Sequence, residues 1–143
     1  PPRFATFEDA LDWVSAADGR EDCARRAHAA VTARHRGWRM RLDAVPKLPF
    51  ADPEWMWAHR GALLCTHLNR LVRRLLVDGP HFAEEEVRFA WTNVWYVAPH
   101  EYVRARIARE RWIAIDPWGR TYGIPFGEYG SGWKSGSVFP ARG

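Results

Sequence analysis

Cysteine and long apolar runs are both scarce in this sequence of 143 residues. Its two cysteines, Cys23 and Cys65, are too few for the disulfide framework of a small secreted domain, and they lack the paired spacing of a zinc knuckle. No apolar stretch approaches the roughly 18 to 20 residues that a membrane-spanning helix needs. We therefore expect no metal site and no membrane span, while one disulfide between the two cysteines stays open.

The start of the chain also lacks two common features. It begins with Pro1 instead of Met, and no apolar stretch of a signal peptide follows. We expect residues 1–143 to form one domain, because this length supports a single core but not two. We further expect this domain to be excised from a longer protein, for example one that is secreted or delivered into a target cell.

Basic and aromatic residues are abundant. The net charge is +4 and the pI is near 9.5. Such a balance fits binding to phosphate, nucleic acid or an acidic protein, and it fits the codon bias of a GC-rich genome equally well. The nine tryptophans indicate an aromatic core, a ligand groove, or both.

The first half of the chain has the patterns of helices. Thr6 and Asp9 resemble a capping box, which predicts a helix over residues 7–16. A second helix is expected over residues 21–35, because carboxylates at positions 21 and 22 favour a helix N-terminus. After a short strand at 39–42 and a loop at 46–49, one long helix is expected from Asp52 to Gly79. Its buried seam would be Leu64, Leu68, Leu71 and Leu75.

The second half changes to a period of two residues. Strands are predicted over residues 87–95 and 111–116, as antiparallel neighbours with Trp91 and Trp112 buried. The Arg-rich residues 99–110 between them are interpreted as an excursion with a helical turn, and the tail from Thr121 as loops with one short strand. Helices followed by strands predict an α+β fold, with N-terminal helices packed on a small antiparallel Trp-rich sheet.

A motif of chemical interest spans the two predicted strands. Residues 89–95 read Phe-Ala-Trp-Thr-Asn-Val-Trp, and residues 112–117 read Trp-Ile-Ala-Ile-Asp-Pro. This pair resembles the core of the transglutaminase-like superfamily, which includes papain-like proteases and deamidases. There, a strand reading His-x-Trp-x-Glu-Val carries the catalytic histidine, and a neighbouring Trp-x-x-x-Asp-Pro strand carries the aspartate that orients it. The resemblance implies that Asp116 is this aspartate, and that Trp91, Asn93 and Trp112 contact substrate.

The resemblance also implies a nucleophilic cysteine at the start of a helix. We favour Cys23 in this role, because a thiol in the first turn of a helix is near unpaired N–H groups that favour the thiolate. Cys65 is the alternative, although the expected long helix would place it well inside, away from a helix terminus. A buried, inert thiol is the ordinary state of either cysteine.

The motif departs from the superfamily at two positions, since Phe89 stands at the histidine position and Asn93 at the glutamate position. A thiol without an imidazole lacks its general base. Either another histidine supplies the base, or the domain is a pseudoenzyme. The candidate histidines are His28, His35, His81 and His100.

Three functions follow as hypotheses. The first is a cysteine-dependent acyl-transfer enzyme (a protease, deamidase or transglutaminase-like hydrolase) that acts on protein amides, as in a toxin or effector module. The second is a non-catalytic module that binds a protein or glycan. The third, not favoured, is a nucleic-acid-directed nuclease toxin that uses Arg104, Arg106, Arg109 and Arg111. No glycine cluster opens a helix to cradle phosphate, and no cofactor is expected.

Overall fold

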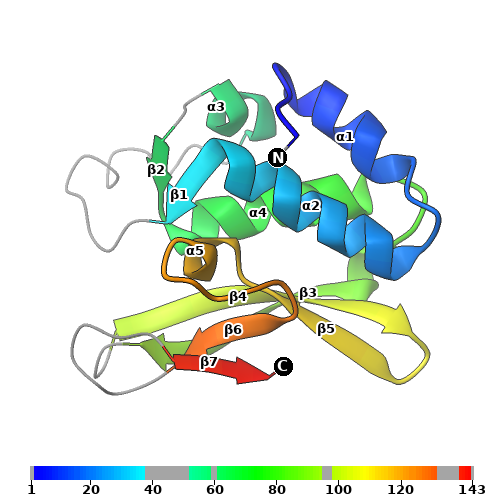
Figure 1. Ribbon diagram of the computed structural model, residues 1–143. Helices are drawn as coiled ribbons and strands as arrows, with labels where there is room; N and C mark the ends of the chain where they lie inside the picture. Colours follow the sequence, from blue (N-terminus) through cyan, green and yellow to red (C-terminus); the bar gives the residue numbers. More distant parts are fainter. Residues whose placement is uncertain (1, 38–51, 59–60, 95–97, 132–138, 143) are drawn as a thin grey trace.

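The computed structural model describes residues 2–37, 52–58, 61–94, 98–131 and 139–142. Its helices form one layer and its main antiparallel sheet forms a second layer beneath them (Figure 1). The predicted α+β fold is therefore confirmed. No helix among these residues is long and apolar enough to cross a membrane.

The first two helices agree closely with the sequence patterns. Helix α1 (Phe7–Ser15) begins at the predicted capping box, in which Thr6 and Asp9 each accept a hydrogen bond from the other's backbone N–H. Helix α2 (Arg20–Arg34) ends at His35, whose backbone is extended. Strand β1 (His35–Gly37) follows at once.

The prediction of a single long helix after Asp52 is wrong. The chain instead forms helix α3 (Pro53–Ala58), strand β2 (Gly61–Leu63) and helix α4 (Cys65–Val77). Strand β2 pairs in parallel with β1, with His35 opposite Gly61. This pairing joins segments distant in sequence and overrides the local helical pattern at Gly61, a residue of low helix propensity. The strand ends just before Cys65, so Cys65 becomes the first residue of a helix.

The main sheet has the order β3-β4-β5. Its strands are β3 (Val87–Val94), after the 3-10 turn η2 (Glu84–Glu86), β4 (Ala98–Ala108) and β5 (Arg111–Ile115). The predicted strands at 87–95 and 111–116 therefore exist, but they are not neighbours, because β4 lies between them and pairs antiparallel with both. The interpretation of residues 99–110 as an excursion with a helical turn was wrong.

The C-terminal part closes the fold. Helix α5 (Pro117–Arg120) follows β5 directly, and strands β6 (Glu128–Ser131) and β7 (Phe139–Arg142) form an antiparallel pair. The tail thus has two short strands where one was expected. The predicted strand at 39–42 and loop at 46–49 lie outside the described residues.

The core lies between the helix layer and the sheet. The predicted face of α4 is buried, with Leu68, Leu71 and Leu75 fully inaccessible, whereas Leu64 precedes the helix and is half-buried. The prediction that Trp91 is buried is wrong, since its side chain is 61% exposed on β3. Trp112 is half-buried.

Candidate functional site

Cys65 lies at the N-terminus of α4. Leu64 is the N-cap in an extended conformation and supplies no side-chain hydrogen bond to the first turn. The leading backbone N–H groups of this helix therefore have no capping side chain, and the first turn contains no acidic residue. The thiol is free of any disulfide and half-buried. A cysteine in this position meets the positive end of the helix dipole, which favours the thiolate.

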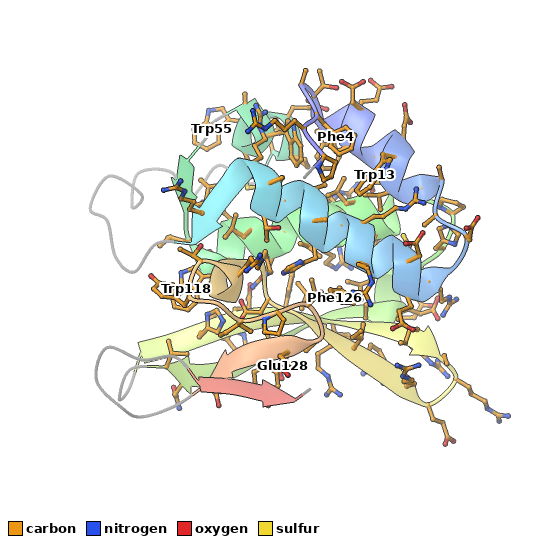
Figure 2. All side chains as sticks on the ribbon, in the orientation of Figure 1. Phe4, Trp13, Trp55, Trp118, Phe126 and Glu128 are labelled. Atoms are coloured by element: carbon orange, nitrogen blue, oxygen red, sulfur yellow. The ribbon has the colours of Figure 1, made fainter. Side chains whose placement is uncertain are left out.

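His100 lies near the start of β4 and meets Cys65 across the layer interface. Its ring is buried, and Nε2 lies 2.8 Å from Oδ2 of Asp116. The ring also hydrogen-bonds the side chain of Cys65, and Nδ1 is the nitrogen left for that contact. Trp118 packs on the imidazole with ring centroids 4.5 Å apart. Figure 2 labels Trp118 on α5, between the helices and the sheet.

The surroundings of His100 favour its protonated form. Burial lowers the pKa of His100, but hydrogen bonds and negative charge from Asp116 and Cys65 outweigh that effect and raise the pKa to about 9. A protonated imidazole between a thiol and a carboxylate is the charge arrangement of an activated cysteine.

Asp116 is fixed on every side. It is fully buried and is the N-cap of α5, where Oδ1 accepts a hydrogen bond from the Gly119 backbone N–H at 2.9 Å. Its Oδ2 accepts from the Gly130 backbone N–H at 2.8 Å, in addition to His100. A Cβ added at Gly119 would lie 2.6 Å from Oδ2, so this close approach requires glycine. The carboxylate can therefore hold the imidazole in a single orientation.

Asn69 connects the helix of the thiol to the strand of the imidazole. It lies one turn after Cys65 on α4 and is fully buried. Its Nδ2 donates to the Glu101 backbone oxygen at 2.7 Å and to Glu101 Oε1 at 3.2 Å. Because Glu101 directly follows His100, these bonds fix the distance between the two layers beside the site.

Strand β1 supports the site from the side of α5. The Gly37 backbone N–H donates to Thr121 Oγ1 at 2.8 Å. A Cβ added at Gly37 would lie 2.5 Å from the Trp118 backbone oxygen. Glycine thus permits the close packing that holds Trp118 against His100.

Cys23, the favoured nucleophile of the sequence analysis, lies elsewhere. It is in the first turn of α2, as predicted, but only 1% of it is exposed. Burial and the charge of Asp22 raise the pKa of Cys23 to about 11, and the opposing charge of Arg26 does not offset them. The expectation that the helix terminus lowers this pKa was wrong. The same carboxylates that favour the N-terminus of α2 disfavour a thiolate beside them.

The residues expected to contact substrate lie apart from one another. Trp91 pairs with Glu101 in the register of β3 and β4, next to the row of His100, and Asn93 is exposed on the same strand. Trp112 is at the far end of β5, where Arg88 and Arg104 lie 5.1 and 6.0 Å from its ring centroid. Of the three residues, Trp91 and Asn93 are nearer to His100, because they pair with Glu101 and Pro99, its two neighbours on β4.

Phe89 does not occupy the position of the missing imidazole. It pairs with Val103 in the middle of the sheet and is 40% exposed, with Arg73 stacked 6.0 Å from its ring centroid. The imidazole that lies beside a thiol and Asp116 is that of His100, one strand further along the chain. The segment from His100 has Tyr102 where the motif has Trp and Arg104 where it has Glu, so the motif gave no signal for this histidine.

The described residues contain no group of three or more His, Cys, Asp or Glu side chains that could hold a metal ion. Cys65, His100 and Asp116 bring a thiol, an imidazole and a carboxylate together at one place. Compared with known protein families, curated proteins and solved structures, the chain matches none.

Proposed function

We propose that this protein is a cysteine-dependent acyl-transfer enzyme in which Cys65 is the nucleophile, His100 the general base and acid, and Asp116 the residue that orients the imidazole. The single observation that carries the proposal is the position of His100, hydrogen-bonded on one side to Asp116 at 2.8 Å and on the other to Cys65. Three residues from separate segments converge there, and each has the chemistry its role needs.

The roles follow from the contacts. The thiolate of Cys65 would attack the carbonyl carbon of an amide, and His100 would give its proton to the leaving amine. A water or an amine would then release the acyl group from the thioester, with His100 as the base. Asp116 keeps Nε2 engaged throughout, so that Nδ1 faces the sulfur.

The substrate class that we propose is a carboxamide in a protein, consistent with the resemblance of the Trp112 to Pro117 segment to transglutaminase-like enzymes. Exposed aromatic side chains at Trp91 and Phe89 on β3, the strand that pairs with the strand of His100, support a protein substrate, because such residues commonly anchor partners. The same exposure would serve a binding module, which is the second candidate function.

Acylation by an activated ester tests the proposal without knowledge of the substrate. The intact protein is mixed with p-nitrophenyl acetate, and the release of nitrophenol is followed while mass spectrometry locates the acetyl group. We expect a rapid burst, with acetyl on Cys65, and no burst in Cys65→Ala. The matched control is Cys23→Ala, which should keep the burst. A wild-type protein without a burst, or with acetyl on Cys23, would overturn the proposal and favour the binding module.

The reaction class needs a separate measurement. Casein is incubated with the protein, with and without a primary amine such as a dansylated cadaverine. Ammonia release alone indicates a deamidase, incorporation of the amine indicates a transglutaminase, and new amino termini indicate a protease. Each signal should be absent in Cys65→Ala and in His100→Gln.

A further inference from the structure

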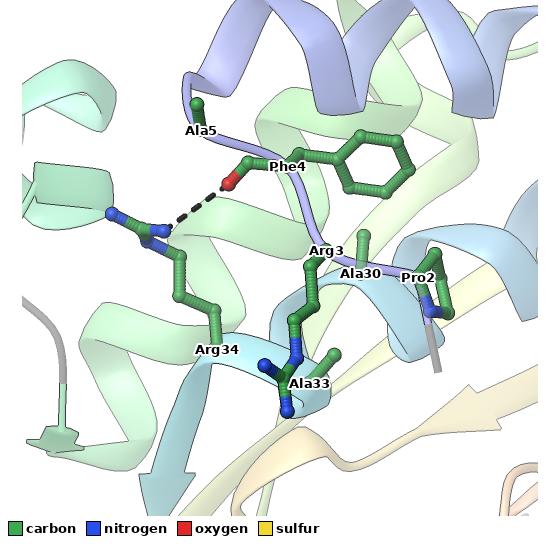
Figure 3. Close-up of a pocket in the computed structure, with 7 residues that line it drawn as sticks. All are labelled: Pro2, Arg3, Phe4, Ala5, Ala30, Ala33 and Arg34. Carbon is green, nitrogen blue, oxygen red and sulfur yellow. Dashed lines mark hydrogen bonds between the residues drawn. The ribbon is translucent and has the colours of Figure 1, made fainter.

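A second hollow of the molecule lies apart from Cys65, His100 and Asp116, none of which lines it. A cleft of about 820 Å³ opens between the second half of α2, strand β1 and helix α5. This volume is within the range of small-molecule sites, about 300 to 1,000 Å³. The cleft adjoins a smaller hollow of about 410 Å³ beneath the N-terminal segment, shown in Figure 3, and the two share Pro2, Ala33 and Arg34.

The charges around the cleft are of one sign. Arg36 on β1 and Arg120 on α5 both line it and are exposed. The hydrogen bond from Gly37 to Thr121 joins their chain neighbours, so the two arginines emerge from adjacent backbone positions. Neither forms an ion pair with another described residue, and no Asp or Glu is among the described residues that line the cleft. Two such guanidinium groups suit a phosphate, which they can bind bidentately.

Arg34 also lines the cleft but is already engaged. Its guanidinium donates to the backbone oxygens of Phe4 and Trp57, and the Phe4 bond is drawn in Figure 3. It therefore adds positive potential to the cleft, while its hydrogen bonds hold the N-terminal segment and α3 in place.

His28 supplies a different kind of group. It lines the cleft from α2, is 6% exposed, and its Nε2 has no hydrogen-bond partner among the described residues. The other side of the ring hydrogen-bonds the backbone of Asp116. Burial lowers the pKa of His28 to about 4, with a contribution from the nearby charge of Arg120. The neutral ring donates through Nδ1, so Nε2 carries a lone pair that accepts a hydrogen bond.

A buried polar nitrogen without a partner in a cleft of ligand size calls for a donor from outside the protein. A sulfate or chloride ion would leave Nε2 unsatisfied, because neither ion has a hydrogen-bond donor at neutral pH. A ligand that joins a phosphate to hydroxyl groups satisfies both halves of the cleft.

We propose that the cleft between α2, β1 and α5 binds a small phosphate monoester that carries hydroxyl groups, such as a sugar phosphate. Arg36 and Arg120 hold the phosphate, and a hydroxyl of the ligand donates to Nε2 of His28. The cleft is a separate site from the proposed acyl-transfer site, because none of its lining residues is Cys65, His100 or Asp116, although His28 hydrogen-bonds the backbone of Asp116.

Calorimetric titration of the intact chain tests the assignment, with ribose 5-phosphate as the probe and with inorganic phosphate and ribose as its two halves. We expect ribose 5-phosphate to bind at least about tenfold more tightly than phosphate, and ribose not to bind. Arg36→Ala and Arg120→Ala should each weaken binding of ribose 5-phosphate by about tenfold or more. Both side chains are exposed, so the fold should tolerate their removal.

The matched control is Arg25→Ala. Arg25 lies on α2 like His28, is exposed, and stacks 4.6 Å from the Phe126 ring centroid outside the cleft. Its charge contributes to the lowered pKa of His28 but it does not line the cleft, so its loss should weaken binding far less than the loss of Arg120. The proposal is overturned if ribose 5-phosphate gives no heat at about 10 mM, far above the affinities at which small ligands act. It is equally overturned if phosphate binds as tightly as ribose 5-phosphate, or if Arg25→Ala weakens binding as much as Arg120→Ala.

Discussion

Two cysteines occupy the first turns of two helices in this molecule, and only one has the surroundings of a nucleophile. Cys23 in α2 is buried next to Asp22, and its pKa is raised to about 11. Cys65 in α4 is half-buried, has no carboxylate in its helix turn, and hydrogen-bonds the ring of His100. The helix terminus is common to both.

The contrast shows that a helix dipole is a weak determinant of thiol chemistry. Its contribution is typically about 0.3 to 1 kcal/mol at a surface, whereas burial of a charged group costs several times more. On the proposed function, the adjacent imidazole and the partial exposure of Cys65 distinguish it from Cys23. The predictions below alter the surroundings of one cysteine and use the other as the reference.

The largest effect is expected from removal of the imidazole. His100→Gln deletes the imidazole that hydrogen-bonds Cys65, and with it the activation that the proposed function assigns to this thiol. Alkylation of Cys65 by iodoacetamide should slow by about two orders of magnitude. Peptide mass spectrometry at timed intervals gives the rate for each cysteine, and that of Cys23 should not change. Faster modification of Cys23 in this variant would indicate a general loss of structure, and an unchanged rate at Cys65 would contradict the account.

A smaller effect is expected from displacement of the carboxylate. Gly119→Ala places a Cβ 2.6 Å from Asp116 Oδ2, so the side chain that orients His100 must shift. The alkylation rate of Cys65 should fall by about tenfold. The matched control is Gly19→Ala, next to Cys23, because a Cβ there meets nothing within 4 Å. That variant should leave both rates and the urea midpoint nearly unchanged, and a rate loss in it would contradict the account.

The free energy of unfolding should be affected more by replacement of Cys23 than by replacement of Cys65, the reverse of the order expected for alkylation. Cys23→Ala removes a fully packed sulfur from the core and should lower the free energy of unfolding by roughly 1 to 2 kcal/mol. Cys65→Ala, at a half-buried position, should cost less than about 1 kcal/mol. Urea denaturation at neutral pH measures both. A larger cost at Cys65 would mean that its main role is in packing.

The last comparison concerns pH. The pKa of His100 in the folded state, about 9, exceeds its ordinary 6.5, so its contribution to stability is complete below about pH 6.5 and is lost as pH rises through 9. The pKa of His28 is lowered to about 4, so its contribution is present above 6.5 and lost as pH falls towards 4. The free energy of unfolding, measured by urea denaturation from pH 4 to 10, should therefore fall at both the acidic and the alkaline end. His100→Gln should remove the alkaline slope between about pH 6.5 and 9, whereas above pH 9 the raised pKa of the buried Cys23 adds a slope of its own. If the slope below pH 9 persists in His100→Gln, the raised pKa of His100 is not its cause.

Local patterns predicted the elements that depend only on local contacts. The capping box of Thr6 and Asp9 correctly predicts the start of α1, because both partners are three residues apart. Strand β5 and the buried face of α4 were also predicted from periodicity. The proline after Asp116, at the first position of α5, is a local signal of the same kind.

The candidate site was harder to predict because it depends on pairing between distant segments. Strand β2 exists through its contact with β1, and only that contact makes Cys65 the first residue of a helix. Strand β4 was missed because its arginines suggested a loop, although Val103 and Ala105 alternate with them. Because β4 was not predicted, His100 could not be placed in the sheet. The sequence comparison with the superfamily motif therefore put Phe89 at the histidine position.

The central claim is that Cys65 and His100 form an activated pair that Cys23 lacks, and competitive alkylation of the unmodified protein tests it most directly. The folded chain is treated with limiting iodoacetamide at pH 6.5, quenched at intervals, and the modified fraction of each cysteine is measured by peptide mass spectrometry. The account predicts that Cys65 is alkylated at least about a hundredfold faster than Cys23, and that the ratio approaches one in urea. Similar rates for the two cysteines in the folded protein, or faster modification of Cys23, would contradict it.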